Sequence, residues 1–293
     1  MLTFTFLGVG NAFAKRNYQS NVLVEAWSKG PDHQAAPDDT VLIDFGTTGP
    51  FALHALKDRP GFEYLARNGQ VHYPGIRRIF ITHQHADHIG GLEEMALTNT
   101  FLSRDPQTGK GFKPQIISSI NILVNLWDHS LKGGLNTVPG RYALLQDYFF
   151  IQALRPGEPG HERFHLLKRY CFEIFPTDHV KIERKYDWPS YGLYLTDTQS
   201  GQSVFFSGDS RFDYAAYADR MGRAKICFHE VQLIEEPEPV HSLISEMRTL
   251  PPEVKKKTIL YHYGDMWDSG PFGFVDQEFA GFAEPQRRYV LFE

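Results

Sequence analysis

Cysteines and long apolar runs are both scarce in this chain of 293 residues. The two cysteines, Cys171 and Cys227, each lie within a short apolar segment, which predicts buried hydrophobic side chains rather than a disulfide framework. No window reaches the roughly eighteen uncharged apolar residues of a membrane span, and the first residues lack the basic head of a signal peptide. We therefore expect a cytoplasmic protein that does not contact a membrane.

The chain also lacks a surplus of basic residues. The chain has 30 basic and 35 acidic residues, a formal charge of −5. Proteins that grip a polyanionic backbone usually carry a concentrated basic face. The two short basic runs, at 77–78 and 255–257, are typical of the solvated ends of helices and strands. Extended DNA or RNA is therefore disfavoured as a partner.

Short apolar segments with the character of β-strands recur along the whole chain and alternate irregularly with helical patterns. The predicted strands are 2–7, 21–26, 40–44, 78–81, 116–124, 164–175, 191–196, 203–207, 226–229 and 258–262. The clearest predicted helices are 92–98, 214–218 and 241–250. This pattern favours two sheets with helices outside, a four-layer αββα sandwich, and we expect one domain over residues 1–293.

The segment 99–162 differs from the rest because Gly/Pro-containing loops surround the aromatic-rich stretch 142–150. An insert beside a catalytic motif often forms a lid or a dimer arm. An ordinary packed helix is the alternative.

Four metal-binding residue types occur within six positions, in Thr82-His-Gln-His-Ala-Asp-His-Ile-Gly-Gly91. The segment follows a predicted strand and precedes a helix, so its side chains should project from a turn at the end of the strand. Zn²⁺ favours imidazole nitrogen and carboxylate oxygen. His83, His85, Asp87 and His88 are therefore predicted metal ligands.

Three further candidates each stand just after an apolar run: His179, Asp209 and His262. With these residues the chain resembles the metallo-β-lactamase-fold hydrolases, whose hallmark is His-x-His-x-Asp-His followed by separate His, Asp and His motifs. The resemblance implies one metal held by His83, His85 and His179. It implies a second metal held by Asp87, His88 and His262, with Asp209 bridging both. Asp44 is expected to be structural, either orienting the site or capping a loop.

Two metals a few ångströms apart can share a hydroxide that attacks the substrate and can polarise its ester oxygen. Asp209 stands where the β-lactamase branch typically has cysteine, so antibiotic hydrolysis is disfavoured. The segments around His229-Glu-Val-Gln232 and Val240-His-Ser242 resemble tRNase Z-type phosphodiesterases. By that resemblance His241 stabilises phosphate charge or protonates the leaving oxygen, and Glu230 raises its pKa. Asp87, His241 and Glu230 are the predicted catalytic residues, while His229 is expected to be structural.

Only 30 positions separate His179 from Asp209, so the arm with which tRNase Z grips tRNA has no room here. The chain is similar to short relatives that cleave cyclic mononucleotides, including the anti-Pycsar enzymes of phages and bacteria. It shares with them a Phe-Leu-Gly start and Asn17-Tyr-Gln-Ser-Asn21. This resemblance implies hydrolysis of 3′,5′-cyclic CMP, UMP, AMP or GMP in a homodimer whose subunits complete each other's sites.

Other functions remain open at this point. A tRNase Z-like endoribonuclease or another phosphodiesterase is the nearest alternative, followed by a thioester or lactone hydrolase. A non-enzymatic nucleotide-binding protein is disfavoured by the complete ligand set, because purely structural metal sites close their coordination sphere. The ligand mixture also suits Mn²⁺ or Fe²⁺.

Overall fold

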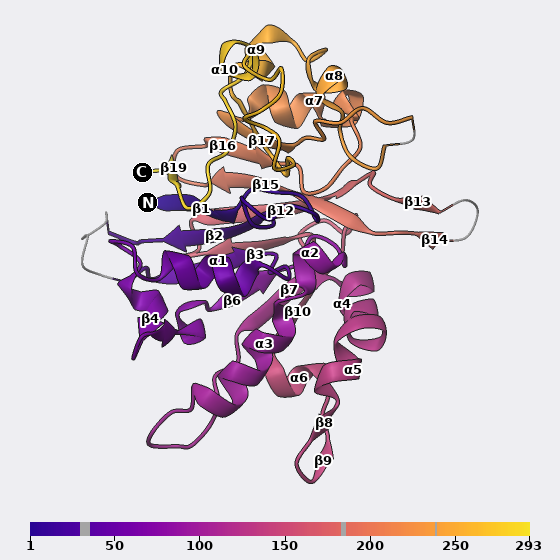
Figure 1. Cartoon of the computed structure of the whole chain (residues 1–293). Coiled ribbons are helices and arrows are strands. Elements are labelled where there is room, and N and C mark those ends of the chain that lie inside the picture. Colours follow the sequence, from indigo (N-terminus) through magenta and orange to yellow (C-terminus); the bar gives the residue numbers. More distant parts are fainter. Residues whose placement is uncertain (30–35, 183–185, 238) are drawn as a thin grey trace.

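Two β-sheets packed face to face form the centre of the computed structural model (Figure 1), which describes residues 1–29, 36–182, 186–237 and 239–293. The strands of the first sheet are β1 (Leu2–Gly8), β2 (Asn21–Ala26), β3 (Asp39–Ile43), β6 (Arg78–Phe80), β7 (Gln115–Ser119), β10 (Phe150–Leu154) and β19 (Arg288–Phe292). Those of the second are β11 (Arg163–Leu166), β12 (Tyr170–Thr177), β15 (Ser190–Asp197), β16 (Ser203–Phe206), β17 (Ile226–Glu230) and β18 (Thr258–Tyr261). Their spatial orders are β10-β7-β6-β3-β2-β1-β19 and β11-β12-β15-β16-β17-β18.

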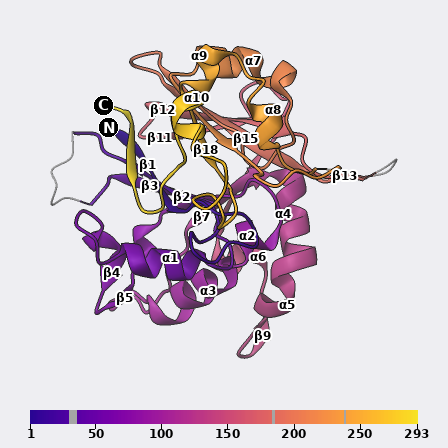
Figure 2. The same cartoon turned by 45° about the horizontal axis from the view of Figure 1, so that its top comes forward.

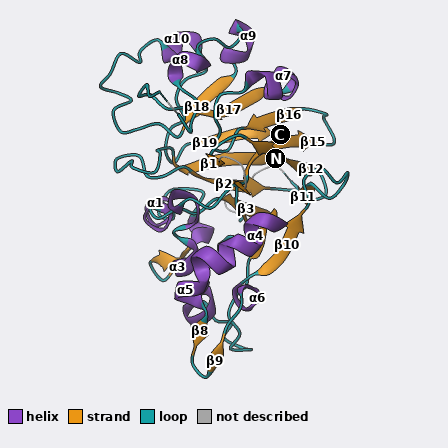
Figure 3. Cartoon of the chain, turned by 90° about the vertical axis from the view of Figure 1, so that its right-hand side faces the viewer, coloured by secondary structure: helices purple, strands orange, loops and turns teal. Residues whose placement is uncertain are grey.

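Helices cover the outer face of each sheet, as Figures 2 and 3 show. On the side of the first sheet lie α1 (Gly49–Leu56), α2 (Ala86–Ile89), α3 (Leu92–Leu97), α4 (Ile120–Leu126), α5 (Lys132–Leu135) and α6 (Leu145–Tyr148). On the side of the second lie α7 (Tyr214–Arg223), α8 (Ile244–Met247), α9 (Pro252–Lys255) and α10 (Val275–Glu278). Three short hairpins complete the chain: β4 (Ala66–Arg67) with β5 (Gln70–Val71), β8 (Thr137–Val138) with β9 (Arg141–Tyr142), and β13 (Lys181–Ile182) with β14 (Tyr186–Asp187). The predicted four-layer αββα arrangement is confirmed.

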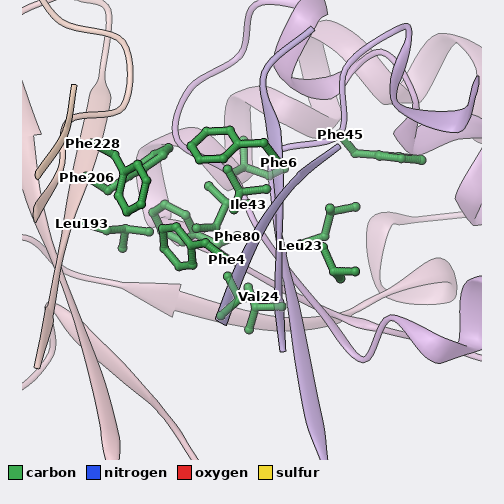
Figure 4. Close-up of a cluster of buried hydrophobic side chains, with 14 of the residues drawn as sticks. Phe4, Phe6, Leu23, Val24, Ile43, Phe45, Phe80, Leu193, Phe206 and Phe228 are labelled. Atoms are coloured by element: carbon green, nitrogen blue, oxygen red, sulfur yellow. The ribbon is translucent and has the colours of Figure 1, made fainter. Parts of the chain in front are cut away.

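Aromatic side chains fill the space between the sheets (Figure 4). Alternate residues of β1 point toward the second sheet, where the ring of Phe4 lies 5.5 Å from that of Phe228 and 6.1 Å from that of Phe206. Phe6 lies 5.5 Å from both Phe228 and Tyr261. These rings are almost fully buried, so they supply much of the apolar area that holds the two sheets together.

The parallel strands determine which loops lie next to one another at the edge of each sheet. β3, β6, β7 and β10 run parallel in the first sheet, and β16, β17 and β18 run parallel in the second. Because parallel strands end at the same edge, the segments after β16, β17 and β18 emerge together. The segments containing Asp209, His241 and His262 follow these three strands in turn.

Three predicted elements differ from the structure. The strand predicted over 116–124 ends at Ser119, whose hydroxyl accepts a hydrogen bond from the backbone N–H of Ile122 and thereby caps α4. The strand predicted over 164–175 is a hairpin of β11 and β12. The helix predicted over 241–250 is helical only at Ile244–Met247, because the preceding residues are held beside Glu230.

The segment 99–162 contributes β7 and β10 to the first sheet. Its aromatic stretch contains the short helix α6, in which Leu145 and Tyr148 are buried, as expected of a packed helix. Both cysteines are free, and Cys171 is half-buried rather than buried because it lies near the edge of the second sheet. Among the described residues no helix has the length and apolar character required to cross a bilayer.

Candidate metal centre

All seven predicted metal ligands lie together at the edge of the two sheets, and these seven residues are called the cluster below. They form two neighbouring groups in which the candidate ligand atoms lie within 4.8 Å of one another. The groups are His83, His85 and His179, and Asp87, His88, Asp209 and His262. The family resemblance implies the same two groups, except that it has Asp209 bridging both metals, whereas here Asp209 falls in the second group.

The first group consists of three nitrogen atoms that face each other. His85 Nδ1 lies 3.0 Å from His83 Nε2 and 3.1 Å from His179 Nε2. Nitrogens bound about 2.0–2.1 Å from a tetrahedral ion would stand roughly 3.3 Å apart. The spacing therefore fits a shared cation.

Asp209 lies between the two groups. Its Oδ2 is 3.2 Å from His88 Nε2, 3.3 Å from His262 Nε2 and 3.7 Å from His83 Nε2. Among the described residues, both Asp209 carboxylate oxygens and the Nε2 atoms of His88 and His262 are buried without a hydrogen bond. Buried polar atoms are normally satisfied, so this set of orphaned ligand atoms fits divalent metal ions.

Hydrogen-bond partners on the side of the ring away from the cluster fix the orientation of four histidines. The Nδ1 atom of each of these rings has a partner outside the cluster: Thr82 Oγ1 for His83 (3.0 Å), Asp44 Oδ2 for His88 (2.7 Å), the Val240 carbonyl for His179 (2.7 Å) and Ser20 Oγ for His262 (2.6 Å). Such contacts leave Nε2 for a metal. His85 is different because its Nδ1 is the atom that faces the group.

Local backbone geometry brings α2 close to the end of β3. A Cβ atom on Gly46 would stand 1.8 Å from the carbonyl oxygen of Asp87, so only glycine allows this approach. Asp44 and His262 both adopt left-handed conformations, with φ of 60° and 64°. Such strained residues cluster at functional sites.

Burial and charge set the protonation of the cluster. Burial lowers the pKa of His83 well below its ordinary value and brings the pKa of His179 and of His262 to about 4, which favours the neutral, metal-binding imidazole. Burial opposes protonation of His88 too, but the nearby carboxylates of Asp209, Asp87 and Asp44 outweigh it and raise the pKa. This excess of negative charge suits a cation.

The predicted pair of His241 and Glu230 lies next to this cluster. His241 Nδ1 is 3.3 Å from Glu230 Oε1 and 4.0 Å from Asp209 Oδ2. Burial opposes its protonation, but the Glu230 carboxylate raises the pKa of His241 to about 9. His241 is 19% exposed, whereas Glu230 is fully buried. His241 can therefore reach a substrate while Glu230 holds it in place.

Other predicted residues lie elsewhere. His229 is buried with Nδ1 on the Glu230 carbonyl, 2.8 Å away, and packs its ring on Phe205, so it takes no part in either group. The β8–β9 hairpin, which carries exposed Tyr142, projects from the far end of the molecule, away from α2 (Figure 1). Within one chain, the hairpin that carries Tyr142 therefore lies away from the cluster.

Sequence reasoning did not find every residue around the cluster. Ser20 binds His262, and it lies inside Asn17–Asn21, a segment that carried the family resemblance without a role. The Trp188 ring stacks on His85 with centroids 5.8 Å apart. A lone tryptophan before a strand gives no sequence signal for such a contact.

Comparison with known proteins agrees with this geometry. A family model described as "Anti-Pycsar protein Apyc1" matches residues 2–289. The protein of that name from Paenibacillus sp. (strain J14) is 33% identical over 280 residues, which cover 94% of this chain and 95% of the relative. The one from Bacillus phage vB_BsuM-Goe3 is 32% identical over 297 residues, covering 98% and 97%.

Solved structures share the fold. The metallo-β-lactamase fold protein YhfI from Bacillus subtilis matches with a TM-score of 0.65 and 15% identity, covering 98% of each chain. Human tRNase Z, short form, matches with a TM-score of 0.62 and 17% identity, covering 99% of this chain and 100% of the other. Yeast PDE1 matches with a TM-score of 0.64 and 16% identity, covering 92% and 89%. The predicted metallo-β-lactamase fold is confirmed.

Proposed function

The chain belongs to the family of anti-Pycsar proteins Apyc1, and from this premise we propose that it is a cytoplasmic phosphodiesterase that hydrolyses 3′,5′-cyclic nucleotides such as cyclic CMP, UMP, AMP and GMP. One observation carries the proposal: a buried cluster with orphaned ligand atoms lies beside the His241–Glu230 pair. The cluster suits divalent metals, and the pair suits proton transfer at a phosphodiester.

We assign His83, His85 and His179 to one metal, and Asp87, His88 and His262 to a second, with Asp209 shared. Zn²⁺ fits this mixture of imidazole and carboxylate ligands best, and Mn²⁺ and Fe²⁺ fit it too. Two such ions, when bound, activate water for attack on phosphorus and neutralise phosphate charge.

The remaining chemistry belongs to side chains of the protein. Glu230 accepts hydrogen bonds from the backbone N–H groups of Ser210 and Ser242, both at 3.1 Å, and so is fixed in place. It holds His241 Nδ1, which leaves Nε2 of His241 to face the substrate. We assign to His241 the donation of a proton to the ribose oxygen that leaves phosphorus.

Hydrolysis by purified protein loaded with Zn²⁺ or Mn²⁺ tests the proposal. Cyclic AMP, GMP, CMP and UMP are assayed beside bis-p-nitrophenyl phosphate, a thioester and a pre-tRNA. We expect conversion of cyclic nucleotides to linear monophosphates, and chelation should abolish it. Cleavage of the pre-tRNA alone would identify an endoribonuclease, and cleavage of the thioester alone would identify a thioesterase.

We also propose that the enzyme is a homodimer, which the family resemblance implies. Light scattering coupled to size-exclusion chromatography measures the oligomeric state directly.

A further inference from the structure

The cavity next to His241 has apolar walls that neither the metal cluster nor proton transfer requires. We propose that this cavity is the nucleobase subsite and that Phe13 is the ring on which the base stacks. This inference rests on the proposed function. It makes Phe13 a residue that determines substrate binding, contributed by the same chain that holds the cluster.

The cavity has a volume of about 290 Å³, and its lining is largely apolar. It includes Asn11, Phe13, Leu233, Ile234, His241 and Met266. That volume lies just below the usual range for ligand pockets and is of the right order for a base with part of its ribose. Since His241 lines the cavity, a phosphodiester beside this residue would direct its attached nucleoside into it.

Exposed apolar side chains from three separate segments meet here. Phe13 follows β1 and is 84% exposed, Ile234 follows β17 and is 61% exposed, and Met266 follows β18 and is 43% exposed. The segments after β17 and β18 also carry His241 and His262. A group of exposed apolar residues around a polar reactive residue is typical of a ligand-binding surface.

The loop that carries Phe13 is firmly held even though its ring is exposed. The backbone N–H groups of Lys15 and Arg16 donate to the Asp265 carboxylate, at 2.7 and 3.0 Å. The carbonyl of Ala12 accepts a hydrogen bond from Gln19 Nε2 at 3.0 Å. An exposed aromatic ring on a fixed backbone is preorganised, so stacking on it costs little ordering entropy.

The segment that carries Ile234 is fixed in a similar way. The carbonyl of Ile234 accepts a hydrogen bond from Gln232 Nε2 at 2.8 Å, and the carboxylate of Glu235 accepts from the hydroxyl of Ser245 at 2.9 Å. Phe13 and Ile234 both line the cavity on anchored loops, so a flat base in the cavity has apolar contacts from two segments. Stacking on one aromatic ring tolerates any base because every base has a π-face.

Phe13→Ala tests the inference, with Phe51→Ala as the matched control. Phe51 is also an exposed phenylalanine, 70% exposed, but it lies on α1 and lines a different hollow. We expect Phe13→Ala to raise KM for cyclic UMP about tenfold with kcat within about twofold of wild type, as expected for loss of one base-stacking contact. Phe13→Tyr should restore KM, and Phe51→Ala should leave it unchanged.

Calorimetry supplies a readout that does not require turnover. In the wild type, 5′-CMP should bind more tightly than ribose 5-phosphate, which lacks the base, and Phe13→Ala should remove most of this difference. Circular dichroism confirms that each variant is folded.

Three results would overturn the inference. If Phe13→Ala leaves both KM and the preference for 5′-CMP over ribose 5-phosphate unchanged while the wild type is active, the subsite is wrong and the proposed function still holds. A dimer-to-monomer change in Phe13→Ala would identify the surface as a subunit interface. A wild type that hydrolyses no cyclic nucleotide would remove the proposed function and the subsite together.

Discussion

At the scale of single residues, two buried carboxylates near the cluster have different surroundings. Glu230 accepts hydrogen bonds from two backbone N–H groups and contacts His241. Asp209 is buried with neither carboxylate oxygen in a hydrogen bond among the described residues, and the rings of His88 and His262 oppose its charge. Burial would raise the pKa of Asp209, yet His262 and His88 hold it well below its usual range. A bound cation is the partner that Asp209 lacks.

This contrast predicts different effects of two substitutions. Asp209→Ala should lose bound metal and activity together, because it removes the carboxylate that lies between the two groups. His241→Ala should keep its metal content and lose about 10²- to 10⁴-fold in kcat, the usual range for a general acid. Elemental analysis of the purified variants and steady-state kinetics measure the two effects.

One result would show that His241 binds metal rather than donating a proton. His179, Asp209 and His241 themselves form a group that could hold a metal. If His241→Ala lost metal but kept normal turnover per bound metal, His241 would be a ligand rather than the proton donor.

The sequence singled out these seven residues because four share one short motif after a predicted strand and three each stand just past another, and the structure brings all seven together. Their partners were harder to find. Asp44 was expected to orient the site or to cap a loop, and its Oδ2 lies 2.7 Å from Nδ1 of the predicted ligand His88. Ser20 and Trp188 could not be assigned, since serine and tryptophan have no pattern that distinguishes a contact to a metal ligand from ordinary packing.

At the scale of elements, the contact between α2 and the segment after β3 sets the position of Asp87. The backbone N–H of Phe45 donates to the His88 carbonyl at 2.7 Å, and that of Gly91 donates to the Phe45 carbonyl at 2.8 Å. Gly46 allows this approach because it has no side chain to meet the Asp87 carbonyl. The contact therefore couples the first sheet directly to the ligands of the second group.

Gly46→Ala should disrupt this contact. We expect a loss of about 1–3 kcal/mol of unfolding free energy, as for other overpacked sites, together with reduced metal content, because Asp87 and His88 must shift. Thermal unfolding and elemental analysis measure both. Gly133→Ala is the control: a Cβ there meets nothing within 4 Å, and alanine favours its helix α5. Equal stability of the two variants would contradict the argument.

Sequence patterns predicted the strands well but misplaced some boundaries. The segment 116–124 is rich in β-forming isoleucine, yet the chain bends into α4 after Ser119 because a hydroxyl cap is available there. The helical pattern over 241–250 starts late because the Ser242 N–H donates to Glu230, a residue far away in sequence. Tertiary contacts of this kind cannot be read from local patterns.

At the scale of the whole molecule, one ion pair ties the second sheet to the end of the chain. Arg169 donates to Asp197 at 2.8 and 2.9 Å and to the carbonyl of Glu293 at 2.6 Å. Asp197 is almost fully buried. The hydrogen bonds from Arg169 hold the pKa of Asp197 well below its usual range.

Asp197→Asn should therefore destabilise the protein in a pH-dependent way. A carboxylate with a depressed folded pKa contributes stability above its unfolded pKa of about 4, and this stability is lost as the pH falls. We expect a loss of about 1–3 kcal/mol at pH 7, as for hydrogen bonds to a charged group, and a smaller loss near pH 3. Urea unfolding at both pH values measures it.

The control for this experiment is Asp219→Asn, which removes an exposed helical pair with Arg223. Exposed pairs contribute little, so this variant should unfold like wild type at both pH values. An equal loss at pH 7 and pH 3 for Asp197→Asn would show that charge is not the cause. We expect a single unfolding transition in each case, as a single domain over residues 1–293 predicts.

The pairing of β1 with both β2 and β19 has a consequence for how the protein is made. Leu2 pairs with Phe292 and Thr3 with Val290, so β1 receives its second neighbouring strand from β19, which lies much later in the sequence. Until β19 forms, one edge of β1 has free backbone groups next to buried phenylalanines, and such edges recruit other chains. This edge is thus exposed to aggregation while the residues between β1 and β19 are synthesised, and shielding by a chaperone would matter most before β19 emerges.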